Sequence, residues 1–180
     1  MKQAIMTIAV LAALLPISTA MAQQQMQTFT DASGSFTVDY PLGWKIIQPP
    51  DDSQGSSVIF INPYGGGESL NIVIGPNQTR TALAVGLEEY AQTQLDHLLS
   101  TERGAKIVQD MECQKYQIQG RKACSNIVSS GPKHSELLLF MLMTTGNQDV
   151  YVLTYGNSAK NFDPNLLLFD KILKTFKFSR

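Results

Sequence analysis

The residues whose chemistry is most informative are the two cysteines, Cys113 and Cys124. They stand on either side of Gln119-Gly120, each within a stretch of extended character. A hairpin that turns there would bring the two thiols nearly opposite one another, so the sequence predicts a cross-strand disulfide in an oxidising compartment. Two buried free thiols are the alternative. The chain has no Cys-x-x-Cys redox motif, and two cysteines alone cannot build a zinc site.

Metal ligation would need other side chains to converge. The two histidines, His97 and His134, would have to meet carboxylates, and nothing in their spacing indicates that they do. We interpret both as surface residues. The pair Asp51-Asp52 offers oxygens for calcium but lacks the alternating ligands of a calcium loop, so it is interpreted as a solvated loop. We expect neither a metal nor a cofactor.

Nucleophilic and phosphate chemistry also lack a recognisable pattern. Gly65-Gly66-Gly67 is not followed by the Lys-Ser/Thr pair and helix of a phosphate loop, which favours a hairpin tip. There is no G-x-S-x-G elbow, and the serines and histidines have no triad spacing. The sequence therefore predicts that the protein is not an enzyme.

A few further side chains could bind something, but each has a simpler interpretation. Trp44 is interpreted as a core anchor behind a tight corner, with a ligand platform as the alternative. Glu88 and Glu89 are expected to be solvated on a helix. The methionines that could form a copper site, and that we expect to serve only in packing, are Met111, Met141 and Met143.

The first 22 residues indicate export. Lys2 precedes an apolar run over residues 4–15, Pro16 follows it, and Ala20-Met21-Ala22 fits a signal-peptidase site, which predicts cleavage before Gln23. An uncleaved anchor is the alternative. We expect a flexible leader over residues 23–28 and a single domain over residues 29–180. Asn77 begins the sequon Asn77-Gln78-Thr79 on a turn, where a glycan could be attached.

The composition excludes several function classes. Among 180 residues, 43% are hydrophobic and 16% charged, and the formal net charge is −1. Binding to nucleic acid usually requires a dense basic face, so we expect no nucleic-acid partner. After residue 22 no apolar run is long enough to span a bilayer, so the mature chain is not expected to cross a membrane.

Periodicity predicts strands around two helices. The helix over residues 81–103 should bury Leu87, Tyr90 and Leu95, and a second helix should start with Asp163 as N-cap and Pro164 as first residue, with an apolar stripe that includes Leu167, Leu168 and Leu173. The expected strands cover residues 36–40, 45–48, 57–61, 70–74, 106–119, 121–129, 136–145, 149–155 and 176–178. Short turns between them favour antiparallel pairing, and the chain is assigned to the α+β class.

The order of these segments resembles the PsbP-like family over residues 29–178. The residues that carry the resemblance are Phe36-Thr-Val-Asp-Tyr-Pro-Leu-Gly-Trp44, Leu87-Glu-Glu-Tyr90, Tyr151-Val-Leu-Thr-Tyr155, Asn161-Phe162 and Lys171-Ile-Leu-Lys-Thr-Phe-Lys-Phe178. The resemblance implies an α/β/α sandwich with a central antiparallel β-sheet flanked by helices, shared with a nuclear Ran-binding factor. It also implies a non-catalytic role, as in the photosystem II subunits that help retain calcium and chloride.

The chain departs from the photosynthetic members, because it has a plain secretory signal and lacks their lysine-rich character. The main hypothesis is a secreted, extracytoplasmic, non-catalytic binding or accessory domain that contacts an unknown protein partner or a membrane-associated complex. The alternative is a small extracytoplasmic hydrolase or metal-dependent enzyme with an unfamiliar site.

Overall fold

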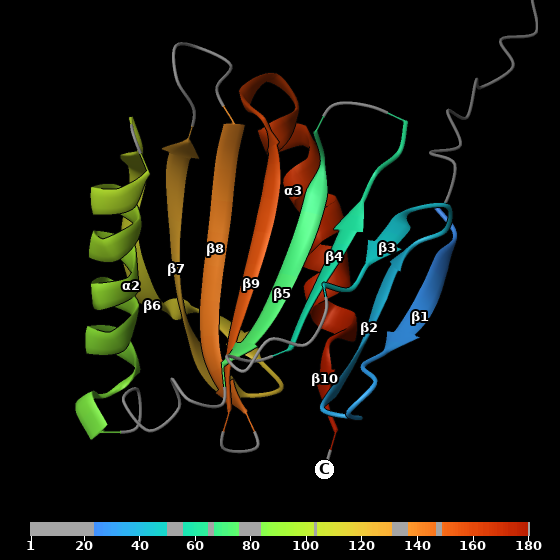
Figure 1. Ribbon diagram of the computed structural model, residues 1–180, viewed down its shortest axis with the longest axis horizontal. Helices are drawn as coiled ribbons and strands as arrows, with labels where there is room; N and C mark the ends of the chain where they lie inside the picture. The colour runs from blue at the N-terminus through green and yellow to red at the C-terminus, as the bar shows by residue number, and fades with distance from the viewer. Residues whose placement is uncertain are drawn as a thin grey trace, which may run out of the picture.

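Figure 1 shows a computed structural model of the chain. It describes residues 24–49, 56–64, 67–75, 84–102, 104–130, 137–146 and 149–179. The predicted signal peptide, the Asn77 sequon, His134 and the Asp51-Asp52 pair lie outside the described residues. The helices are α2 (Leu87–Thr101) and α3 (Ala159–Thr175), and the strands are β1 (Met26–Thr30), β2 (Phe36–Pro41), β3 (Lys45–Ile47), β4 (Ser56–Ile61), β5 (Ser69–Gly75), β6 (Lys106–Ile118), β7 (Arg121–Ser130), β8 (Leu137–Gly146), β9 (Asp149–Ser158) and β10 (Lys177–Phe178).

A seven-stranded sheet forms the centre of the molecule. Its strands lie in the order β3-β4-β5-β9-β8-β7-β6, and each neighbouring pair is antiparallel (Figure 1). Short connections between β-branched and aromatic runs favour this pairing. The two edges of the sheet are therefore β3 and β6.

The two helices cover opposite faces of this sheet. Side chains alternate between faces along a strand, and on β9 Tyr151, Leu153 and Tyr155 join the core beneath α3, whereas Val150 and Val152 pack with α2. From α3, the core contains Phe162, Phe169 and Ile172, and from α2 it contains Tyr90 and Ala91. This arrangement confirms the predicted α/β/α sandwich with a central antiparallel sheet.

A second, small sheet of order β1-β2-β10 lies beside the large one. The expected flexible leader over residues 23–28 is wrong in its second half, because Met26 starts a strand that pairs with Pro41 of β2. Two contacts explain why this segment forms a strand. The Thr28 hydroxyl donates to Asp39 at 2.6 Å, and the Phe29 ring lies 5.4 Å from that of Phe60. The predicted final strand exists, but it joins this sheet through β2.

Helix α2 begins at Leu87 and lies within the predicted helix over residues 81–103. Gly86 precedes it with φ 93°, a left-handed conformation that ends any helical run before Leu87. Of the residues expected in the interior, Tyr90 and Leu95 are buried and Leu87 is partly buried. The predicted start at residue 81 lies outside the described residues.

Helix α3 starts earlier than predicted, at Ala159, so the assignment of Asp163 as N-cap and Pro164 as first residue is wrong. Phe162 explains the difference. Its ring is 1% exposed and lies 5.9 Å from that of Tyr155, and burying this apolar surface stabilises an additional helical turn. Pro164 costs that helix one hydrogen bond. Leu167, predicted on the apolar stripe, is 67% exposed, and Phe169 is buried instead.

Trp44 is buried at 6% exposure in the core beneath α3, which confirms its interpretation as a core anchor. Its backbone N–H donates to the carbonyl oxygen of Pro41 at 3.2 Å, and Gly43 supplies the positive φ of 90° that this turn requires.

No helix in the described part of the chain is both long and apolar enough to cross a bilayer.

Candidate binding surfaces at the two edges of the sheet

The hairpin of β6 and β7 turns at Gln119-Gly120, where both residues have positive φ, 49° and 76°. This is the two-residue turn that matches the twist of antiparallel strands. In the structure Cys113 and Cys124 are joined by a disulfide across the hairpin. Cys124 is 1% exposed beneath α2, whereas Cys113 is only partly buried.

Strand β6 is irregular where the disulfide attaches. Glu112 pairs with Ser125, and the next pair is Tyr116 with Ala123. Three residues of β6 thus lie opposite the single residue Cys124, which makes a β-bulge. Such a bulge bends the strand and releases backbone groups from regular pairing with the neighbouring strand.

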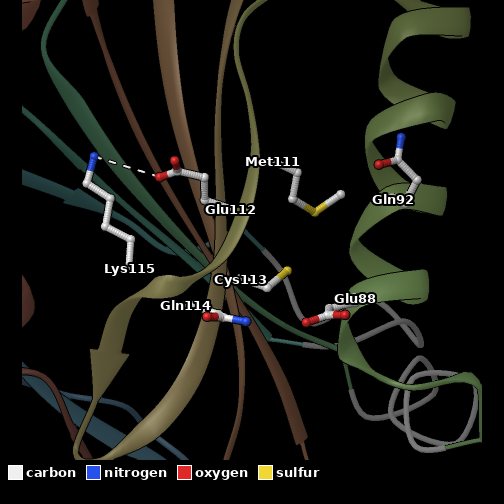
Figure 2. Close-up of a pocket in the computed structure, with 7 residues that line it drawn as sticks. All are labelled: Glu88, Gln92, Met111, Glu112, Cys113, Gln114 and Lys115. Atoms are coloured by element: carbon white, nitrogen blue, oxygen red, sulfur yellow. Dashed lines mark ion pairs between the residues drawn. The ribbon is translucent and has the colours of Figure 1, made fainter.

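A groove of about 780 Å³ runs between α2 and this bulge (Figure 2). Glu88 and Gln92 project from α2, one helical turn apart, and five consecutive residues of β6 form the other wall. Figure 2 shows Met111 and Cys113 directed toward the helix, while Glu112 and Lys115 point away from it. The lining residues, which we call the β6 groove, are Glu88, Gln92, Met111, Glu112, Cys113, Gln114 and Lys115.

The helix that forms one wall of the β6 groove is acidic. Helix α2 carries Glu88, Glu89 and Asp96 but no lysine or arginine between Leu87 and Thr101. Lys122 of β7 forms an ion pair with Glu88 at 2.5 Å, and both side chains are more than half exposed. Exposed pairs of this kind contribute little stability, because water screens them.

On β6 itself, Lys115 lies 3.9 Å from Glu112, again with exposed partners. On the same strand, the pKa of Tyr116 is raised by burial and by the nearby carboxylates of Asp170 and Glu112. A neutral phenol therefore persists there into alkaline solution.

At the opposite edge of the sheet, large apolar side chains are exposed around β3. Their exposed fractions are Leu42 54%, Ile46 37%, Ile47 46% and Tyr64 87%. The Tyr64 ring lies over the turn at Gly43, since a Cβ added there would be 3.7 Å from its Cε2. We call these four residues the β3 corner.

A buried polar cluster fixes the loop that carries Tyr64. Glu68 is 6% exposed, and its carboxylate accepts hydrogen bonds from the Tyr155 hydroxyl at 2.7 Å and from the Asn62 amide at 2.9 Å. The Tyr64 N–H in turn donates to Asn62 Oδ1 at 3.0 Å. Burial and the bond to Glu68 raise the pKa of Tyr155 well above its usual range. Asn157 completes the cluster by donating to the Tyr155 hydroxyl.

A family model described as PsbP matches residues 24–178. The chain belongs to the PsbP family. The match confirms the resemblance seen in the sequence, and it starts within the segment that was expected to be a leader. No curated protein sequence matches the chain.

Solved structures show the same PsbP fold at low identity. Cyanobacterial PsbP (CyanoP) from Synechocystis sp. PCC 6803 is 17% identical, with a TM-score of 0.63 over 88% of this chain and 95% of that one. The Ran-binding protein Mog1p from Saccharomyces cerevisiae is 11% identical, with a TM-score of 0.56 over 86% and 96%. A protein of unknown function from Pseudomonas aeruginosa is 14% identical, with a TM-score of 0.51 over 83% and 94%.

The other candidate residues of this PsbP domain do not converge on one site. His97 is exposed on α2, and no group of three or more metal-ligating side chains gathers among the described residues. Met143 is buried and Met141 partly buried in the core beneath α2, so both serve in packing as predicted. Met111 packs there too, but it also lines the β6 groove. Gly67 is described, with φ 71°, while its two glycine neighbours lie outside the described residues.

Sequence reasoning missed both edge surfaces. Glu88 and Glu89 are exposed as predicted, but Glu88 also pairs with Lys122 and lines the β6 groove. The β3 corner joins residues from a turn, a strand and a loop, and no periodic pattern connects them. The one available signal was the pair Ile46-Ile47, two adjacent apolar residues in a strand too short to bury both.

Proposed function

We propose that this PsbP-family protein is a non-catalytic binding or accessory domain that acts outside the cytoplasm by contacting a partner protein, alone or within a membrane-associated complex. The observation that carries the proposal is the β3 corner. Soluble domains rarely leave several large apolar side chains exposed around one short strand unless they bind something. An exposed tyrosine among these residues suits a protein interface, where aromatic residues contribute much of the binding energy.

The β3 corner is also rigid, which favours binding. Trp44 anchors the turn from beneath, and the Glu68 cluster holds the loop from the side. A surface that is ordered before binding loses less conformational entropy on association. Because these supports are internal to the domain, a partner would meet a preformed surface.

Three further observations support this function and location. The sequence predicts a signal peptide over residues 1–22, and the disulfide suits an oxidising compartment. The neighbour from yeast is a Ran-binding protein, so in one relative of this fold the work is recognition of another protein. The proposal assigns no catalytic residue and no cofactor.

The test is site-directed photo-crosslinking in the native host. A benzoylphenylalanine introduced in place of Tyr64 should give a discrete cross-linked product in the exported fraction. The product should disappear when Ile47→Asp is added to the same chain, since a buried carboxylate at the patch opposes docking.

The matched control places the same photoreactive residue at Leu167, an exposed leucine on the far face of α3. That position should give no discrete product. Equal products from both positions, or a Tyr64 product that survives Ile47→Asp, would show that the β3 corner is not an interface.

A further inference from the structure

The β6 groove lies at the other edge of the sheet and invites a different kind of contact. Within the described residues no strand lies beyond β6, so its outer backbone edge borders the groove. Five consecutive residues line one side, about 13 Å of extended chain at the usual rise per residue. An exposed strand edge of this kind is a common binding site for an extended peptide, which adds to the sheet as a further strand.

The bulge gives this site a fixed shape. The residues between Glu112 and Tyr116 lie opposite Cys124 alone, and the disulfide ties Cys113 to it. A bulge also interrupts the long regular edge that two copies of the chain would need for pairing. The irregularity thus argues against a second copy paired along the full length of β6.

Charge specifies the occupant further. The helix wall places Glu88 in the groove, and α2 as a whole carries Glu88, Glu89 and Asp96 without any lysine or arginine. Lys122 and Lys115 offset only part of this charge, and both pairs are exposed enough to exchange for cations of a partner.

The floor of the groove suits alternating side chains. Met111 and Cys113 present sulfur and apolar carbon toward the helix (Figure 2). The amides of Gln92 and Gln114 can bond to a peptide backbone. Successive side chains of an extended segment point to opposite sides, so one set can meet this floor while the other meets the carboxylates.

We infer that the β6 groove is a docking site for an extended segment of a partner protein in which lysine or arginine alternates with apolar residues. This site is separate from the β3 corner. If the β6 groove binds no such segment, the function proposed for the β3 corner still stands. If the β3 corner is not an interface, the inference about the β6 groove still stands.

The probe is a nine-residue fluorescent peptide of alternating lysine and valine, capped at both ends, with a glutamate–valine peptide of equal length as its counterpart. Fluorescence anisotropy with the oxidised protein should show saturable binding of the lysine peptide and none of the glutamate peptide. The Glu88→Lys variant should weaken that binding about tenfold, because it places a like charge at the rim. The matched control is Asp163→Lys, the same charge change at an exposed position on α3, which should leave binding unchanged.

A second variant separates shape from charge. Gln92→Trp fills the groove without changing any charge, and it should abolish peptide binding while the melting temperature stays the same. Three results would overturn the inference: no binding of the lysine peptide, equal weakening by Glu88→Lys and Asp163→Lys, or full binding by Gln92→Trp. A concentration-dependent dimer that Gln92→Trp dissociates would also overturn it, since the occupant would then be a second copy.

Discussion

The two edges of the seven-stranded sheet are secured by different physical means. At β3, a strand of three residues is held by a tryptophan buried beneath it and by hydrogen bonds to the buried carboxylate of Glu68. At β6, a strand of thirteen residues is mostly exposed along its length, and it is held by pairing with β7 and by a disulfide to that strand.

The difference follows from how much each edge can bury. A short strand next to the core needs only one large side chain to remove a substantial apolar area from water. The long strand lies outside the main core over most of its length, and a covalent link replaces the missing burial by restricting the unfolded chain. Substitutions at the two edges should therefore behave differently in size and in mechanism.

The largest effect is expected at the β3 edge. Trp44→Ala should lower the free energy of unfolding by about 3–5 kcal/mol, because it removes a large apolar surface and leaves a cavity. Urea unfolding monitored by circular dichroism measures this change. Tyr64→Ala at the same corner is the control and should stay within about 0.5 kcal/mol of the parent, since its ring is 87% exposed.

The single tryptophan gives an independent check. Its emission should be blue-shifted in the folded protein and move to the red on unfolding. Emission like that of free indole, together with an unchanged melt for Trp44→Ala, would contradict the assignment of this edge to core packing.

At the β6 edge, the double variant Cys113→Ala/Cys124→Ala should lose about 2–3 kcal/mol through the freed entropy of the unfolded chain. Reduction of the parent with dithiothreitol should produce a similar shift in the urea midpoint. The disulfide also requires that the unfolded, unreduced protein contain no titratable thiol; two thiols would remove the covalent half of the comparison.

The independence of the edges can be measured with the same variants. The edges lie at opposite ends of the strand order, so the loss from Trp44→Ala and the loss from the cysteine variant should add within about 0.5 kcal/mol. A larger coupling energy would mean that the sheet transmits strain from one edge to the other.

Most of the fold could be predicted from the sequence, because local patterns determine it. The alternation in β2, the turn at Gln119-Gly120 and the buried residues Tyr90 and Leu95 of α2 all rest on neighbours in the chain. The errors occurred where tertiary packing outweighs local sequence preference. Phe162 draws α3 back to Ala159 by packing on Tyr155, against the preference of Pro164 for a helix start.

The two binding surfaces could be predicted much less well. The β6 groove depends on a bulge, and a bulge is visible only once the register of two strands is known. The β3 corner depends on Tyr64 folding over Gly43, a contact between residues of no common period. Residues of a surface patch are brought together by tertiary structure alone. Their identities in the sequence therefore do not show that they are neighbours.

A smaller effect is expected from Tyr155→Phe in the polar cluster of the β3 edge. Removing the hydroxyl takes one hydrogen-bond partner from Glu68 and one from Asn157 and should cost about 1–3 kcal/mol at neutral pH. The pH dependence is more specific. The folded state raises the pKa of Tyr155 above its unfolded value of about 10, so the stability it contributes is present below that pH.

As the pH rises above that value, the unfolded state releases a proton that the folded state retains, and stability falls. Urea midpoints should drop between pH 9 and pH 11 in the parent, and the slope should be shallower in Tyr155→Phe. An equal slope in both proteins would show that this hydroxyl is not held neutral. Tyr64→Phe, on the exposed ring, is the control that should leave the slope unchanged.

The smallest effect is expected from the ion pair that joins β7 to α2 beside the β6 groove. Lys122→Ala removes the partner of Glu88 and should change the free energy of unfolding by less than about 1 kcal/mol, because both side chains are exposed to water. The difference from the parent should vanish in 1 M salt, where charges are screened over about 3 Å. Thermal melts at low and high salt measure it. A loss larger than that of the cysteine variant would mean that the contact between β7 and α2, and not the disulfide, contributes most to stability at this end of the sheet, and the contrast between the two edges would have to be redrawn.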